Sequence, residues 1–380
     1  MAQRRKIGII YQYDENWIGG TYYIQNLIAA LGRLPESSMF ELVIFTEDTH
    51  QFDELKDITK YPFLVRGSHV IKLPLLKRVV NTIGRAINGK NIFSVFINDV
   101  EWIFPANKER LFKNDQQFLY WIPDLQENYL PEFFNAKEIA LRKNTQNEII
   151  KNGRYIVFSS QSAKNDFNEI YPSNNLKQFV LNFAVTHPEL KECYSTIDKF
   201  NIPQHFFICC NQFYKHKNHV TIFKAIQLLK KGGYNICVVF TGKEHDDRHP
   251  DFFKELSEMV NVLEIKDQVK MLGFINRVDQ LCLMKHAVAV IQPSLFEGWS
   301  TVIEDAKALQ VKVIASNISV HREQLEKYDL SVLFQTSNEN ELAKSMLAVD
   351  AMDTIVPEYD KNVIAFAENF NMIIDTISTV

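Results

Sequence analysis

One stretch in the last third of the sequence constrains the fold more than any other. Residues 287–291 (AVAVI) form a short, β-branched apolar run, as expected of a buried strand. Pro293 ends this strand because it cannot donate a hydrogen bond to a sheet, and Gly298 permits the tight turn that follows. Thr301 and Glu304 have the spacing of a capping box, which predicts a helix that begins there.

A helix in this position presents its N-terminus at the end of the strand. Free N–H groups at a helix N-terminus favour an anion such as a pyrophosphate. Three carboxylates, those of Glu297, Glu304 and Asp305, lie within the same few residues, and carboxylates accept hydrogen bonds from sugar hydroxyls. The stretch is therefore typical of a site for a ligand that carries both phosphate and sugar.

Short apolar runs alternate with amphipathic stretches along the whole sequence, which predicts parallel sheets covered by helices. A chain of 380 residues is long enough for two domains. We expect an α/β protein with two tandem doubly wound, Rossmann-like domains, residues 1–185 and 205–357, joined by a linker over residues 186–204. The tail, residues 358–380, has helical spacing and is expected to pack back on the first domain.

Composition excludes several classes of protein. A hydrophobic content of 46% and a charged content of 23% describe a soluble globular protein, and a net charge of −4 argues against a dedicated nucleic-acid binder. No apolar run approaches the roughly 18 residues of a membrane span. The basic N-terminus leads into a short strand and does not have the pattern of a signal peptide. We expect a cytoplasmic protein, with peripheral association at the inner face of a membrane as a further hypothesis.

The chain has five cysteines, an odd number, and they do not have the spacing of a disulfide framework. Three of them lie in apolar, strand-like runs, so we expect reduced thiols, as in a cytosolic protein. The sequence contains neither a zinc-like spacing of cysteine and histidine nor an acidic D-x-D motif, and we expect no metal and no cofactor. The cysteines are Cys193, Cys209, Cys210, Cys237 and Cys282.

Two features of the first half are candidates for the acceptor side of a site. Gly19 and Gly20 lie between an expected strand, residues 6–12, and an expected helix, residues 22–31; they form either a plain turn or a loop that faces a ligand. Asp124 follows a strand at the end where ligands bind in open α/β sheets. Its alternative role is that of a turn or N-cap carboxylate.

Two basic segments also have alternative interpretations. Residues 211–219 follow the first strand of the second domain and include Lys217, a cation suited to a diphosphate; the alternative is a solvated loop. His216 and His219 are either ligands or bases, or residues that pack or cap. Residues 75–90 are basic and amphipathic, which predicts a helix with a solvated face or, alternatively, a contact with an anionic membrane or a phosphorylated lipid.

Five blocks of the sequence together resemble the retaining family-four glycosyltransferases, which have the GT-B fold. In chain order they are WIPDLQENYLPEFF, VFSSQSAKNDF, NQFYKHKNH, MLGFINRVDQLCLMKHA and PSLFEGWSTVIEDAKAL. They occur in the order of the family and span most of the chain. The resemblance implies that a hexosyl group moves from a nucleotide-sugar donor to a hydroxyl acceptor in the cleft between the domains, with retention at the anomeric carbon.

The resemblance also implies roles for individual residues. Glu297 corresponds to the glutamate that contacts the donor sugar, and Lys217 to the lysine that binds the diphosphate; we expect these two to be catalytic. No general base is assigned, because the leaving phosphate can accept the proton of the acceptor. The donor-binding residues implied are Gln212, Phe274 beside the nucleobase, the loop Gly298, Trp299, Ser300 and Thr301, and Asp305 at the ribose.

Three positions depart from the family pattern. Asp305 stands where the family has a second glutamate, which makes the motif E-x7-D, and Glu304 then stays the capping-box residue. Gln212 stands where many relatives have an arginine, so fewer cations would face the diphosphate. Glu127 stands where close relatives often have histidine. Trp299 is either a sugar-stacking surface or a core residue.

By resemblance, the acceptor is a glycan or a lipid-linked saccharide, as in the biosynthesis of polysaccharides. Two other functions stay open. A nucleotide-sugar epimerase on the same fold would release isomers of the donor without an acceptor. A non-catalytic sugar-binding subunit would account for the three departures from the family pattern.

Overall fold

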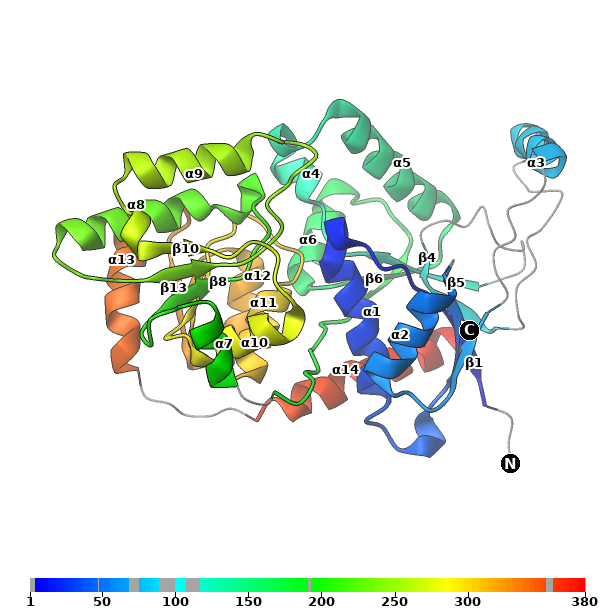
Figure 1. The fold of residues 1–380 in the computed structure, drawn as a ribbon. Coiled ribbons are helices and arrows are strands. Elements are labelled where there is room, and N and C mark those ends of the chain that lie inside the picture. The colour runs from blue at the N-terminus through cyan, green and yellow to red at the C-terminus, as the bar shows by residue number, and fades with distance from the viewer. Residues whose placement is uncertain are drawn as a thin grey trace.

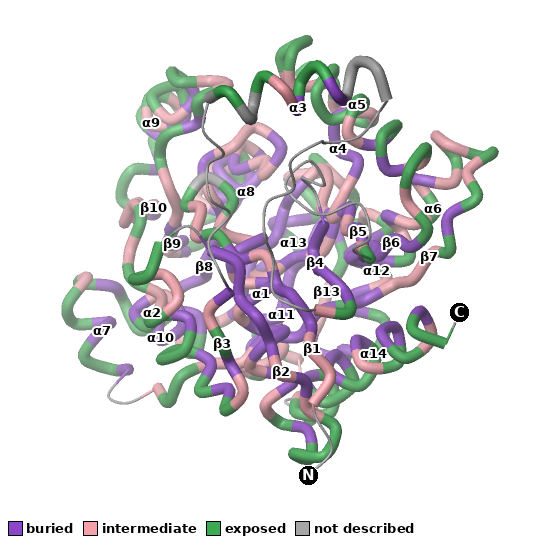
Figure 2. Tube along the Cα trace, turned by 90° about the vertical axis from the view of Figure 1, so that its right-hand side faces the viewer, coloured by how far each residue is buried: buried purple, intermediate pink, exposed green. Residues whose placement is uncertain are grey.

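The computed structural model describes residues 4–46, 48–67, 75–88, 100–106, 117–190, 193–352 and 358–379. It contains two parallel sheets, each with helices packed on it, which lie side by side (Figure 1). The strands in the middle of each sheet are buried (Figure 2). The predicted α/β class with two doubly wound domains is confirmed.

The first domain has a seven-stranded sheet in the order β3-β2-β1-β4-β5-β6-β7. The short apolar run at residues 92–97, which predicts a further strand, lies outside the described residues. The strands are β1 (Lys6–Ile10), β2 (Glu41–Phe45), β3 (Leu64–Arg66), β4 (Trp102–Ala106), β5 (Gln117–Ile122), β6 (Tyr155–Phe158) and β7 (Lys177–Val180). The helices are α1 (Ile18–Leu31), α2 (Thr49–Thr59), α3 (Leu75–Asn88), α4 (Gln126–Tyr129), α5 (Ala136–Asn152) and α6 (Gln161–Ile170).

The second domain has a six-stranded sheet in the order β10-β9-β8-β11-β12-β13. The chain order reverses between β8 and β11, so the loops after these two strands meet where ligands bind in such sheets. The strands are β8 (Phe207–Cys209), β9 (Val238–Phe240), β10 (Val269–Met271), β11 (Val290–Gln292), β12 (Val313–Ser316) and β13 (Ser331–Phe334). The helices are α7 (Cys193–Lys199), α8 (His219–Lys231), α9 (Phe252–Val262), α10 (Arg277–His286), α11 (Thr301–Ala308), α12 (Ser319–Leu325) and α13 (Glu339–Ala348).

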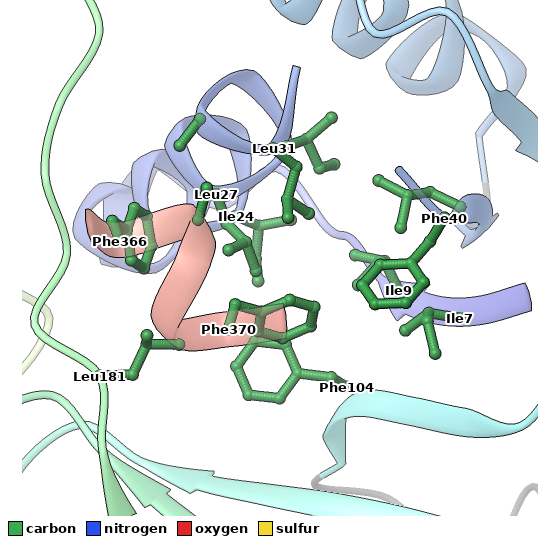
Figure 3. Close-up of a cluster of buried hydrophobic side chains, with 14 of the residues drawn as sticks. Ile7, Ile9, Ile24, Leu27, Leu31, Phe40, Phe104, Leu181, Phe366 and Phe370 are labelled. Carbon is green, nitrogen blue, oxygen red and sulfur yellow. The ribbon is translucent and has the colours of Figure 1, made fainter. Parts of the chain in front are cut away.

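The C-terminal helix, α14 (Asp360–Ser378), lies on the first domain and packs against α1. Its apolar residues recur at helical spacing, and Phe366 and Phe370 are buried among residues of α1 and β1 (Figure 3). The chain therefore passes between the domains twice, and α14 supplies part of the core of the first domain.

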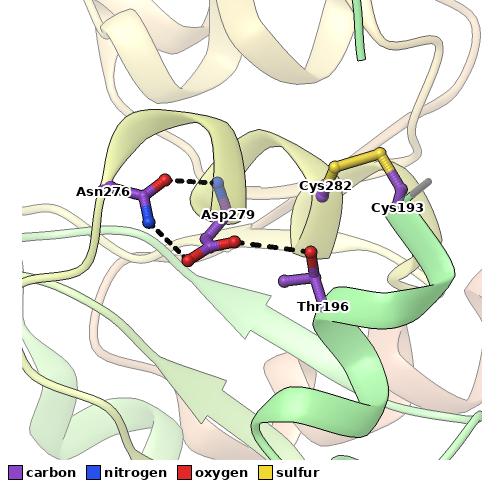
Figure 4. Close-up of a disulfide and its surroundings, with 5 residues drawn as sticks. All are labelled: Cys193, Thr196, Asn276, Asp279 and Cys282. Atoms are coloured by element: carbon purple, nitrogen blue, oxygen red, sulfur yellow. Dashed lines mark hydrogen bonds between the residues drawn. A yellow bond between two sulfur atoms is a disulfide. The ribbon is translucent and has the colours of Figure 1, made fainter. Parts of the chain in front are cut away.

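The segment expected as a linker, residues 186–204, contains α7, which packs on α10 of the second domain. Cys193 of α7 and Cys282 of α10 form a disulfide, with their Cα atoms 4.9 Å apart (Figure 4). The expectation that all five cysteines are reduced is therefore wrong. The pair could not be predicted, because the two cysteines are 89 positions apart and have no local spacing that indicates a disulfide. The free cysteines are Cys209, Cys210 and Cys237.

Helix α3 lies apart from the body of the first domain (Figure 1). Leu76, Val79 and Ile83 are exposed along it, by 79%, 50% and 52%. In the part of the chain that the structure describes, no helix is both long enough and apolar enough to cross a membrane.

Candidate active site

A cleft of about 490 Å³ opens between the two domains, at the carboxyl ends of strands from both sheets. Both halves of the chain contribute polar and charged side chains to it. Predicted site residues that line the cleft are Gly19, Gly20 and Asp124 from the first domain, and Gln212, Lys217, Glu297, Gly298, Trp299, Ser300 and Thr301 from the second.

Lys217 and Glu297 meet in this cleft. Lys217 ends a 3-10 turn, η5 (Lys215–Lys217), in the connection that follows β8, and Glu297 lies in the loop after β11. Because β8 and β11 are neighbours in the sheet, these two loops lie side by side. Lys217 Nζ donates to Glu297 Oε1 at 2.6 Å, and the two side chains are only 17% and 10% exposed.

A buried chain of amides holds the carboxylate of Glu297. Gln292 Nε2 donates to Glu297 Oε1 at 2.8 Å, and Gln292 Oε1 accepts from Asn211 Nδ2 at 2.9 Å. Both amide side chains are buried. The sequence analysis missed both residues. The available signal was that each is polar and stands at the carboxyl end of a strand, Gln292 as the last residue of β11 and Asn211 just after β8.

The helix predicted at Thr301 begins there, but Ser300 is its N-cap. Ser300 Oγ accepts from the Ile303 amide at 3.3 Å, and the Ser300 amide donates to Gln324 Oε1 at 3.1 Å. The Ser300 amide is thus already engaged, whereas Thr301 and Val302, the first two residues of α11, line the cleft. A helix N-terminus in this position favours a bound anion.

The capping-box assignment of Glu304 is wrong. With the N-cap at Ser300, the third helical residue is Ile303, so Glu304 is one position too late to reach back to the cap. Instead Glu304 is buried and accepts from Lys307 Nζ at 2.8 Å and Tyr359 Oη at 2.6 Å. Burial and the nearby carboxylate raise the pKa of the Tyr359 hydroxyl.

Asp305 is buried, and its two carboxylate oxygens differ in their hydrogen bonds. Its Oδ1 accepts from His187 Nε2 at 2.9 Å and from an Arg277 guanidinium nitrogen at 2.5 Å. Its Oδ2 is buried and has no hydrogen-bond partner in the structure described. Burial opposes ionisation, but Arg277 and His187 outweigh it and hold the pKa of Asp305 below its usual value.

Arg277 and His187 are residues that the sequence analysis missed. Arg277 begins α10 and places its guanidinium 4.8 Å from the centre of the Tyr22 ring of α1, so it also contacts the first domain. His187 lies in the first passage between the domains. Arg277 stands in one of the five family blocks, which was the signal available for it, whereas His187 stands in none. Neither contact could be predicted, because Asp305 is far from both residues in sequence.

Gly298 and Trp299 are contacts between the domains. A Cβ atom on Gly298 would lie 2.2 Å from the carbonyl oxygen of Pro123, so glycine is needed for this close approach. Trp299 Nε1 donates to the carbonyl of Phe183 at 3.0 Å, and its ring packs against the core of the first domain. Of its two predicted roles, the structure therefore shows packing.

Gly19 and Gly20 lie in the first turn of α1, which begins at Ile18; the expectation of a loop before a helix at residue 22 is wrong. Glycine near a helix N-terminus is tolerated because the helical constraint is weakest there. A Cβ atom on Gly20 would lie 2.7 Å from the indole of Trp17, whereas one on Gly19 would have no neighbour within 4 Å.

The remaining first-domain candidate, Asp124, is a turn carboxylate that also lines the cleft, as each of its two interpretations required; its role toward an acceptor stays a prediction. Its Oδ1 accepts from the Gln126 amide at 3.2 Å and lies 3.6 Å from a guanidinium nitrogen of Arg142, and the residue lines the cleft. Glu127, the departure from the family pattern, is buried and accepts from Arg142 at 3.2 Å and from Gln146 at 2.6 Å. It holds Arg142 at the edge of the cleft.

Gln212 reaches across the cleft, where its Nε2 donates to the carbonyl of Glu15 at 2.9 Å. Arg248, which the sequence analysis missed, is a further cation in the cleft and donates to Asp246 Oδ1 at 3.0 Å. Phe274 is 55% exposed and is not among the residues that line the cleft.

The two histidines of the basic cluster differ. His219 is buried and stacks on Phe213, with ring centres 4.7 Å apart, and burial lowers its pKa to about 3, so it is a packing residue. His216 lines the cleft, and burial together with the charges of Lys217 and Arg248 keeps its pKa well below the usual value.

Within the described ranges, no group of His, Cys, Asp or Glu has an arrangement that could hold a metal ion.

Comparison with known proteins shows what the chain resembles. Residues 195–367 match the family model described as glycosyl transferases group 1. The match covers nearly all of the second domain and the start of α14, so this part of the chain is similar to the group 1 glycosyltransferases. The resemblance noted in the sequence is confirmed in this domain, which carries Lys217, Glu297 and Asp305. No curated protein matches the chain in a sequence search.

Solved structures match both domains of the chain. Anabaena HepE in complex with UDP and glucose has a TM-score of 0.68 at 16% identity, covering 99% of this chain and 100% of its own. A glycosyltransferase from Rickettsia africae has a TM-score of 0.67 at 16% identity, with 99% and 97% covered. Sucrose-phosphate synthase from Thermosynechococcus elongatus has a TM-score of 0.63 at 14% identity, with 99% and 98% covered. The chain shares the GT-B fold with these proteins.

Proposed function

We propose that the protein transfers a hexosyl group from a nucleotide-sugar donor to a hydroxyl of a saccharide or lipid-linked acceptor, with retention at the anomeric carbon. The observation that carries the proposal is the 2.6 Å contact between Lys217 and Glu297. These residues come from two separate family blocks and meet in the cleft between the domains, next to the N-terminus of α11.

The donor is proposed to carry UDP, because HepE, which has the same fold, was solved with UDP and with UDP-glucose. The diphosphate would take Lys217 Nζ and the first turn of α11 as its partners. Both stabilise negative charge, and a fixed ammonium does so without proton transfer. Asp305 Oδ2, which is buried without a partner, is the proposed acceptor for a ribose hydroxyl.

The site has to stabilise the negative charge that develops on the diphosphate as it leaves. The bond between the anomeric carbon and the phosphate oxygen breaks, and the acceptor hydroxyl forms a new bond on the same face of the sugar. The leaving phosphate oxygen takes the acceptor proton, so no general base is needed. Glu297, released from Lys217 by the diphosphate, is free to accept hydrogen bonds from the donor sugar.

We also propose peripheral contact with an anionic membrane through α3. Its exposed Leu76, Val79 and Ile83 follow a helical i, i+3, i+7 spacing. Residues 58–98 contain seven Lys and Arg residues but no Asp or Glu, in a chain of net charge −4. Exposed apolar side chains in a basic segment favour an anionic lipid surface. Co-sedimentation with vesicles of anionic and of zwitterionic lipid tests this; equal binding to both would contradict it.

The transferase proposal is tested with a panel of nucleotide sugars, scored by release of nucleoside diphosphate. We expect release with one class of donor, and loss of release in Glu297→Ala and Lys217→Ala. Near-normal turnover in both variants would contradict the catalytic roles proposed for Glu297 and Lys217. Analysis of the products separates transfer from epimerisation, because an epimerase forms isomers of the nucleotide sugar without an acceptor and without releasing the diphosphate.

A further inference from the structure

A stack of three aromatic rings leads from the core of the first domain to the cleft. Tyr23 is buried, and its ring centre lies 4.3 Å from that of Trp121. Trp121 in turn stacks on Trp17, with ring centres 5.4 Å apart. All three residues line the cleft, so the stack is a support that runs from a buried tyrosine to a tryptophan at the surface of the cleft.

Trp17 is the exposed end of this stack. It ends the 3-10 turn η1 (Glu15–Trp17) and is 46% exposed. An indole exposed to this degree gains little from burial, so its hydrophobic surface is available to a ligand.

The position of Trp17 is fixed from three sides. Trp121 stacks on its ring and is itself held by a hydrogen bond from its Nε1 to Ser159 Oγ at 3.0 Å. The indole lies against Gly20, where a Cβ atom would come within 2.7 Å of the ring. Across the cleft, Gln212 Nε2 donates to the carbonyl of Glu15, two residues before Trp17. A rigid ring loses little conformational freedom when a ligand binds to it.

The surroundings of Trp17 narrow the class of ligand. The same cleft is lined by the amide of Gln212 and the carboxylate of Asp124, which hydrogen-bond well to hydroxyl groups. A flat apolar face in a cleft with such groups suits a sugar ring, which has apolar C–H faces and polar hydroxyls at its edge. Trp17 belongs to the first domain, whereas the proposed diphosphate partners all lie in the second.

We propose that Trp17 is the platform on which a sugar ring of the acceptor stacks, so that the acceptor is a saccharide and not a simple alcohol. This inference rests on the proposed transferase function. A nucleobase of the donor would also stack on an indole, and the experiment is designed to separate the two.

The first experiment measures Trp17→Ala and Trp17→Phe with the nucleotide sugar that the wild type turns over, and with p-nitrophenyl monosaccharides as acceptors. We expect Trp17→Ala to raise the KM for the acceptor about tenfold or more, on the scale of stacking a ring on an aromatic side chain. Acceptor-independent hydrolysis of the donor should not change. Trp17→Phe should restore most of the acceptor binding, and Tyr194→Ala, which removes an aromatic residue exposed by 74% outside the cleft, is the matched control.

The second experiment does not depend on a disruptive variant. Its probes are methyl glycosides of the same monosaccharides, which lack the p-nitrophenyl ring. We expect them to shift the tryptophan emission of the wild type and to leave that of Trp17→Phe unchanged. An unaltered acceptor KM in Trp17→Ala would overturn the inference, as would a rise in the KM of the donor instead. So would equal shifts in emission in the two proteins, or the absence of any shift in the wild type.

The two proposals fail in different ways. If the wild type releases no nucleoside diphosphate from any donor, the proposed function fails. If the wild type transfers sugar and hydrolyses its donor, but Trp17→Ala has the acceptor KM of the wild type, the function stands and the platform is wrong.

Discussion

The ammonium group of Lys217 lies 2.6 Å from the carboxylate of Glu297, and among the described residues neither side chain has another ion pair. In the proposed function, a diphosphate that binds Lys217 would compete with Glu297, and the same exchange would free Glu297 for the donor sugar. We therefore expect binding of the diphosphate and of the sugar to be coupled through this pair.

Replacing Lys217 with alanine is expected to lower the rate of diphosphate release about a hundredfold or more, the range found when one preorganised charge-stabilising group is removed. Initial rates at saturating donor test this. Lys231→Ala removes an exposed lysine at the end of α8 and is the matched control. Equal rates in the two variants would contradict the role of Lys217.

Replacing Gln292 with methionine, which has a similar shape, is expected to lower the rate and the stability together. The change leaves Asn211 Nδ2 and Glu297 Oε1 without the buried amide between them. A buried polar group that loses its partner costs about 1–3 kcal/mol. Denaturant unfolding and initial rates measure the two effects; an unchanged rate would show that Gln292 does not hold Glu297 in place.

Arg277→Met should destabilise the protein in a manner that depends on pH. It removes the closest cation from the buried Asp305, and breaking a buried pair on one side costs about 3–5 kcal/mol. In the wild type the folded pKa of Asp305 is lower than in the unfolded chain, where it is about 4. The ion pair therefore contributes fully above about pH 4, and its contribution is lost as the pH falls through the lower folded value.

The measurement is the difference in the free energy of unfolding between wild type and Arg277→Met at several pH values. The difference should be largest at neutral pH and shrink in acid. A difference that stays constant down to acid pH would show that the charge of Asp305 does not contribute.

Gly298→Ala is expected to separate the domains locally, because the new Cβ atom would lie 2.2 Å from the backbone oxygen of Pro123. A backbone atom cannot move away as a flexible side chain can, so both the melting temperature and the rate of transfer should fall. Gly19→Ala is the control for the melting temperature, since its Cβ atom would have no neighbour within 4 Å. Equal melting temperatures in both variants would refute the close contact.

Titration of thiols in denaturant without reductant should find three free thiols per chain, because two of the five cysteines form the disulfide. Reduction should raise the number to five and lower the free energy of unfolding by about 2–4 kcal/mol. Cys282→Ser reproduces the loss without reductant. Five thiols before reduction would show that the pair between α7 and α10 does not form.

Much of the fold follows from local patterns in the sequence. The short apolar runs at β1, β2, β8 and β11 predict strands because β-branched and aromatic residues pack well on a pleated sheet. The spacing of apolar residues predicts α14. By contrast, β4 contains Pro105, which weakens its local signal for a strand, and its place in the sheet depends on pairing with β1 and β5.

Some residues of the site could be predicted from the sequence and others could not. Lys217 and Glu297 each stand in a recognisable block, and their contact follows from the order of β8 and β11. Trp17 lies in a segment whose local sequence has no feature that indicates a ligand, and Arg277 lies in a family block that implied no role for it. Their contacts join residues that are far apart in the chain, so only the folded structure brings them out.

The position of α14 has a consequence for the order of assembly. Phe366 and Phe370 belong to the core of the first domain, although they are encoded after the whole of the second domain. On the ribosome, domains generally fold as units once their residues have emerged. The second domain is complete before α14 is made, so the half of the protein that is synthesised first is the half that finishes folding last.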